Sequence, residues 1–87
     1  MTTILSAARA EALFTTGLAT GSSPAFEVVD EAIRAAVRAH GGTRACAADV
    51  AAEFGDHPEL ALPRMRWALD TVALLYPPRR RHWALVA

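Results

Sequence analysis

The chain has 87 residues, 53% of them apolar, and its nine arginines balance nine acidic residues to a formal net charge of zero. One domain of this size lies near the lower limit for a self-sufficient hydrophobic core, and a single cysteine excludes an intramolecular disulfide framework. Twenty alanines favour helices over an all-β domain, the lack of a long apolar run argues against a membrane span, and zero net charge argues against a generally basic nucleic-acid binder.

The chain begins with a predicted helix over residues 3–16. Leu5, Ala8 and Ala12 lie on its modest apolar stripe, together with neighbouring apolar residues. Glycines and serines of the following segment, 17–23, provide turn chemistry and predict a linker.

The second predicted helix has the clearest pattern in the chain. Ser23 is expected to cap it, and Pro24 is expected at its first position. Its apolar face is formed by Phe26, Val29, Ile33, Val37 and His40, which recur at steps of three and four residues. Asp30 and Arg34 pair on the opposite face, and Gly41–Gly42 supplies a left-handed cap.

A third helix is predicted from Thr43 to Phe54, ending at Gly55. Its expected inner face consists of Ala47, Val50, Ala51 and Phe54. Small residues on such a face allow another helix to approach closely.

The fourth helical region starts at a candidate capping box, Asp56-His57-Pro58-Glu59. Because Pro63 has no amide hydrogen for the carbonyl of Glu59, we expect a short turn over 58–62 and a main helix from Pro63 to Tyr76. The fold predicted is thus an all-α bundle of about four helices.

The stretch from Ala47 to Leu69 partly matches a helix-turn-helix. Its first helix and turn glycine fit, but the second helix needs one extra turn residue and contains Pro63. Five arginines against one aspartate between Arg64 and Trp83 give that segment a formal charge of +4. The candidate nucleic-acid contacts are Arg64, Arg66, Arg79, Arg80 and Arg81. Alternatively, any helical bundle contains two helices joined by a glycine turn.

The apolar residues exceed what four short helices can bury, which favours association with a second copy or another protein. The predicted interface consists of Val29, Ile33, Val37, Trp67, Leu74, Trp83 and Leu85. The alternative is that the C-terminal tail folds back and closes the core of its own chain.

Catalysis and metal binding find little support. The one cysteine, Cys46, and the histidines His40, His57 and His82 are too scattered for a zinc pattern. Cys46 with His57 is imaginable as nucleophile and base, but a thiol among alanines is typical of an inert buried residue. We therefore expect no catalytic residue, no metal, no cofactor and no small-molecule substrate.

Three short runs between Arg38 and Ala68 resemble a group of small, mostly uncharacterised helical proteins of actinobacteria. These runs are His40-Gly41-Gly42-Thr43-Arg44-Ala45-Cys46-Ala47, Glu53-Phe54-Gly55-Asp56-His57-Pro58-Glu59 and Arg64-Met65-Arg66-Trp67-Ala68. The resemblance covers about a third of the chain and implies no established activity, so it assigns no functional residue.

The sequence is best interpreted as a single helical domain over 1–87. Its parts are an N-terminal helix and linker (1–22), a helical core (23–78) and a basic and apolar tail (79–87). The expected function is that of a non-enzymatic regulatory or adaptor protein acting through protein–protein contacts, as a homodimer. The alternative is a DNA-binding helix-turn-helix regulator. Because the first residues lack a signal-peptide pattern, a cytoplasmic location is expected.

Overall fold

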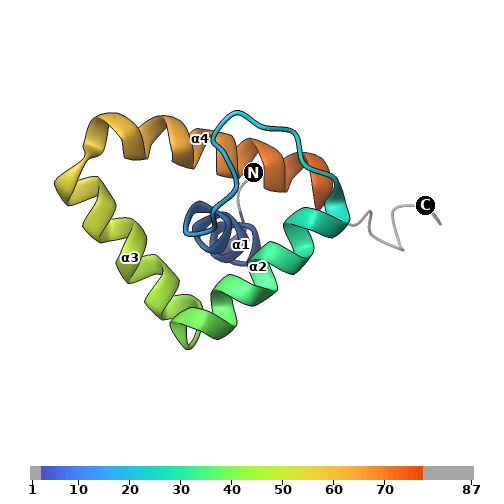
Figure 1. The fold of residues 1–87 in the computed structure, drawn as a ribbon, viewed down its shortest axis with the longest axis horizontal. Helices are drawn as coiled ribbons and strands as arrows, with labels where there is room; N and C mark the ends of the chain where they lie inside the picture. The colour runs from blue at the N-terminus through green and yellow to red at the C-terminus, as the bar shows by residue number, and fades with distance from the viewer. Residues whose placement is uncertain (1–2, 78–87) are drawn as a thin grey trace, which may run out of the picture.

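The computed structural model describes residues 3–77, and these contain four α-helices and no strand. The helices are α1 (Ile4–Phe14), α2 (Phe26–His40), α3 (Thr43–Asp56) and α4 (Pro58–Leu75). In Figure 1, α2, α3 and α4 outline a triangle, and α1 is seen end-on inside it. The predicted all-α bundle is therefore confirmed.

Helix α1 is the centre of the core because it packs against each of the other three helices. Its Ala10, Ala12 and Leu13 have no exposed surface. The larger core cluster joins these residues to Val29, Ile33, Cys46, Trp67, Ala68 and Val72, and a smaller cluster contains Phe14, Val50 and Ala61. Short alanine side chains at the centre let three helices approach α1 at once.

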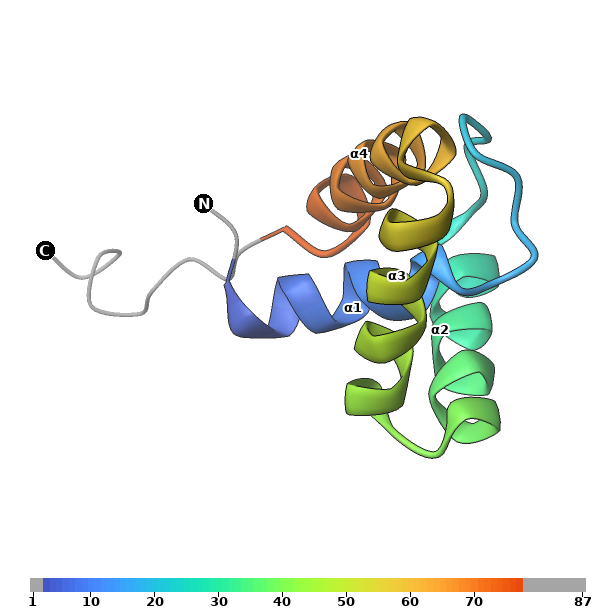
Figure 2. The same cartoon turned by 90° about the vertical axis from the view of Figure 1, so that its left-hand side faces the viewer.

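The N-terminal half of α1 is packed less completely than the C-terminal half. Figure 2 shows it projecting beyond α2 and α3. Thr3 caps this end, since its Oγ1 accepts a hydrogen bond from the Ser6 amide at 3.0 Å. Leu5, predicted on the inner stripe, is 58% exposed.

Helix α2 ends as predicted but begins later. Gly41 has φ +83° and its amide bonds the carbonyl of Val37 at 3.0 Å, as a left-handed cap requires. The predicted start at Ser23 and Pro24 is wrong, since Ala25 precedes the first helical residue and provides no side-chain cap. The segment before α2 is bound to α4, because Trp67 Nε1 donates to the Ser22 carbonyl at 2.8 Å.

The junction of α3 and α4 is tighter than the sequence indicated. Helix α3 continues through Gly55 to Asp56, and His57 alone separates it from α4 without a side-chain capping bond, so the predicted capping box does not form. Val50 is buried on the inner face of α3 as predicted, beside Cys46, whereas Ala51, also expected on that face, is exposed.

The predicted break at Pro63 is also wrong, because α4 is continuous from Pro58 to Leu75. Pro63 is exposed, as is Glu59, whose carbonyl loses its helical donor, so water can hydrate that carbonyl. Ala61 before the proline and Ala68 after it are both buried. Packing on both sides of Pro63 therefore holds the helix together.

Tyr76, at the end of α4, contacts both α1 and α2. Its hydroxyl donates to Asp30 Oδ1 at 2.6 Å, and its ring lies 5.1 Å from that of Phe26, centroid to centroid. The Arg9 guanidinium stacks over the Tyr76 ring at 4.1 Å. The hydrogen bonds from Tyr76 and Arg34 lower the pKa of the Asp30 carboxyl.

This contact makes the ionisation of Tyr76 a test of the fold. Burial and the hydrogen bond to Asp30 raise the pKa of Tyr76 to about 12 from 10.0. As the folded pKa is the higher one, the stabilisation is fully present below pH 10.0 and is lost as the pH rises through about 12. Because the chain has one tyrosine, phenolate absorbance reports it directly. Asp30→Asn should move the midpoint down toward 10.0, and an ordinary midpoint in the unaltered chain would contradict the contact.

Candidate functional site

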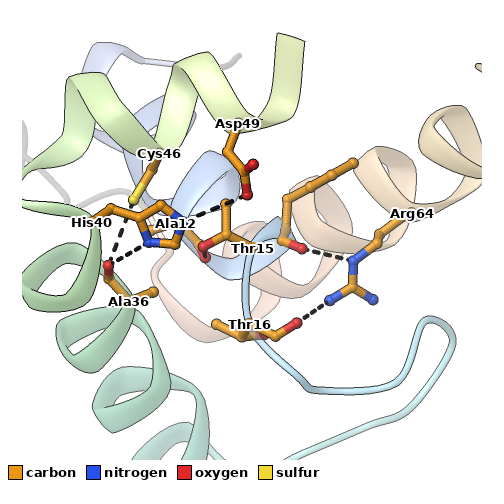
Figure 3. A network of polar contacts seen from close by, with 9 residues as sticks. Ala12, Thr15, Thr16, Ala36, His40, Cys46, Asp49 and Arg64 are labelled. Carbon is orange, nitrogen blue, oxygen red and sulfur yellow. Dashed lines mark hydrogen bonds and ion pairs between the residues drawn. The ribbon is translucent and has the colours of Figure 1, made fainter. Parts of the chain in front are cut away.

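Arg64, the first predicted nucleic-acid contact, is a structural residue at the end of α1. Its Nε donates to the Phe14 carbonyl and its Nη2 to the Thr16 carbonyl, both at 2.7 Å (Figure 3), and its Nη1 donates to Thr20 Oγ1 at 2.8 Å. The guanidinium also lies 5.1 Å from the Trp67 ring centroid. Arg64 therefore caps carbonyls that α1 and the following turn leave without helical partners.

Beyond Arg64, few arginines are available for the predicted nucleic-acid surface within the described residues. Arg66 is exposed, but the two arginines of α4 are balanced by Glu59 and Asp70. The single residue between α3 and α4 is shorter than the turn of a helix-turn-helix, and Gly55 lies inside α3. The predicted contacts Arg79, Arg80 and Arg81 lie outside the described residues.

The residues of the predicted protein interface differ in how much of their surface is exposed. Val29, Ile33 and Trp67 are at most 9% exposed, so these side chains belong to the core of their own chain and we do not retain them as interface residues. They are covered because α2 and α4 both turn their apolar faces toward α1. Val37 is half-buried against the same cluster, whereas Leu74 is 77% exposed. Trp83 and Leu85 lie outside the described residues.

Cys46, His40 and Asp49 come together where α2 meets α3 (Figure 3). His40 Nδ1 lies 2.8 Å from the Ala36 carbonyl, and its Nε2 lies 3.5 Å from Asp49 Oδ2. The Cys46 thiol points to the same carbonyl, with Sγ 3.9 Å from the oxygen. Because both the thiol and His40 Nδ1 are directed at backbone, the group joins two helices and is not arranged as a nucleophile with its base.

The burial of Cys46 predicts a chemically inert thiol. Its side chain has no exposed surface, and burial raises the pKa of the thiol. We expect a disulfide reagent such as DTNB to leave the folded chain unmodified and to label it once per chain in denaturant. Rapid stoichiometric labelling in native buffer would contradict the packing of α3 on α1 and α2.

An apolar groove lies between the N-terminal halves of α1 and α3. It has a volume of about 350 Å³. Its walls are Ile4, Ala7, Ala8 and Glu11 from α1, and Thr43, Arg44 and Ala47 from α3. Ile4 is 92% exposed, the most exposed large apolar side chain among the described residues. This groove, with Ile4 at its edge, is the candidate interaction site.

The apolar stripe predicted for the first helix, through Leu5, Ala8 and Ala12, did not indicate this groove. A signal was present: Ile4, Ala7, Ala8 and Glu11 follow the spacing i, i+3, i+4 and i+7, which places them on one face that adjoins the predicted stripe at Ala8. Which face is left uncovered depends on how α3 crosses α1, and periodicity does not contain that information.

Comparison with models of protein families, with curated proteins and with solved structures finds no match to this chain. Within residues 3–77, no helix is both long and apolar enough to span a bilayer. The same residues contain no group of three side chains placed to hold a metal ion.

Proposed function

We propose that this chain is a small non-enzymatic regulatory or adaptor protein of the cytoplasm that acts through protein–protein contacts as a homodimer. The observation that carries the proposal is the exposed start of α1, where Ile4 is 92% and Leu5 58% exposed beside an apolar groove. Adjacent exposed aliphatic side chains of this kind are typical of association surfaces. A domain of 87 residues also gains stability when a second copy covers apolar surface.

Nucleic-acid binding is the weaker candidate. The whole chain carries nine arginines against nine acidic residues, a formal net charge of zero. Arg64 is occupied by three hydrogen bonds to its own chain. A phosphate-binding surface needs several free cations on one face, and α4 presents Arg66 beside Glu59 and Asp70.

Light scattering on the full chain separates the two functions. At tens of micromolar we expect a mass above that of one chain. On a size-exclusion column at 150 mM salt, we expect the elution volume of a labelled DNA duplex to stay unchanged when the protein is added. A monomer at every concentration would overturn the homodimer. Salt-sensitive retention of the duplex would support DNA binding in its place.

A further inference from the structure

We propose that the groove between α1 and α3 is the seam of the homodimer, in which a second copy docks across a two-fold axis and Glu11 of each copy faces Arg44 of the other. This inference rests on the proposed function. It adds which surface forms the homodimer and which two residues pair across it. Two observations support it: the shape of the groove and the charges on its two walls.

The shape of the surface is complementary to itself. The groove of about 350 Å³ is shallow because alanines line much of both walls. Ile4 stands at its edge as a protruding aliphatic side chain. A two-fold axis brings the same patch of both copies together, so the protrusion of one copy can enter the hollow of the other. Small side chains on the walls allow the helices of the two copies to approach closely.

The charged residues on the two walls of the groove can likewise pair with those of a second copy. Glu11 lies on the α1 wall and Arg44 on the α3 wall. Neither side chain forms an ion pair with any other residue in the described part of the chain. A two-fold arrangement with Glu11 opposite Arg44 satisfies both groups twice, once on each side of the axis.

These charges also argue for a second copy over other occupants. Residues 78–87 contain three arginines and no acidic residue, so that segment offers partners to Glu11 but none to Arg44. A nucleic acid would bring phosphates to Glu11. Among these three occupants, the second copy alone presents both an acid and a base at the required places.

The test is a charge exchange measured by sedimentation equilibrium of the full chain. Glu11→Arg places two arginines in contact across each side of the seam, and Arg44→Glu places two glutamates there. Each variant alone should weaken dimerisation by about tenfold. An equimolar mixture should recover the affinity of the unaltered chain, because a copy carrying Glu11→Arg and a copy carrying Arg44→Glu then meet with opposite charges on both sides of the axis. Pairing within one chain cannot give recovery on mixing.

Each outcome decides the proposal. Variants that dimerise as tightly as the unaltered chain, or a mixture that does not recover, would overturn this seam and leave homodimerisation standing. An unaltered chain that is monomeric would overturn both. Circular dichroism checks that each variant keeps its helices. If either loses them, Glu11→Gln and Arg44→Gln replace the reversals, and each should weaken the dimer several-fold; unchanged affinity would overturn the pairing.

Discussion

Replacing Arg64 by alanine is expected to lower the free energy of unfolding by about 3 kcal/mol. The substitution removes three hydrogen bonds from a charged donor and leaves the carbonyls of Phe14 and Thr16 without these partners. It also removes the guanidinium that stacks near the Trp67 ring. An 87-residue domain has a total stability of roughly 5–10 kcal/mol, so this single loss should be visible in a urea unfolding curve.

Arg66 provides the matched control for Arg64, because it lies on the same helix and is exposed. Arg66→Ala should change the free energy of unfolding by less than about 0.5 kcal/mol. Arg64→Lys should recover less than half of the loss, since an ammonium group cannot reach three acceptors with the geometry of a guanidinium. Equal effects of alanine at the two positions would show that Arg64 is not a cap of α1.

Trp67→Ala is expected to lower the free energy of unfolding by about 3–5 kcal/mol, the typical cost of truncating a buried tryptophan. Trp67 is 9% exposed in the larger core cluster, and its Nε1 donates to the Ser22 carbonyl at 2.8 Å. A loss of this size is a large part of the roughly 5–10 kcal/mol expected for a domain of this size. Differential scanning calorimetry should therefore show a Tm lowered by roughly 12–40 °C.

Trp67→Phe separates packing from hydrogen bonding at this position. It keeps an aromatic ring in the core but removes the donor to Ser22, so we expect a loss of about 1–2 kcal/mol. The extended segment before α2 should then exchange its amides faster. A phenylalanine variant as unstable as the alanine variant would mean that the bond to Ser22, not the packing of the ring, dominates.

The sequence was sufficient where local chemistry decides the structure. The apolar face of α2 follows the helical period from Val29 to Ile33 and on to Val37, and Gly41 ends the helix in the left-handed conformation that glycine favours. The number of helices followed from such patterns. The helical period and the glycine that ends the helix both lie within a few residues of the structure that they predict.

Long-range contacts account for what the sequence did not predict. Arg64 satisfies carbonyls about fifty residues earlier in the chain, and Trp67 donates to the carbonyl of Ser22, 45 residues earlier. Pro63 is tolerated because the packing of Ala61 and Ala68 outweighs one missing hydrogen bond. The local pattern assigned Arg64 to a basic surface and Pro63 to a break, since it contains nothing about the partners that the fold brings to them.

Long-range packing also places the exposed apolar surface at residues other than those predicted for the protein interface. Val29, Ile33 and Trp67 fill the core, and the uncovered apolar surface lies at Ile4 beside the groove between α1 and α3. Ile4 is 92% exposed, so replacing it leaves the core of the single chain intact. It is therefore the position at which association can be altered with the least effect on folding.

Sedimentation equilibrium of the unaltered chain beside Ile4→Glu, over a micromolar concentration series, tests whether the exposed start of α1 holds two copies together. We expect the unaltered chain to approach twice the 9.3 kDa of one chain as its concentration rises. The variant should remain at 9.3 kDa with the same helix content, because a buried carboxylate at the seam is strongly unfavourable. An unaltered chain of 9.3 kDa at every concentration would show that the protein does not dimerise, and a variant that associates equally tightly would show that Ile4 lies outside the seam.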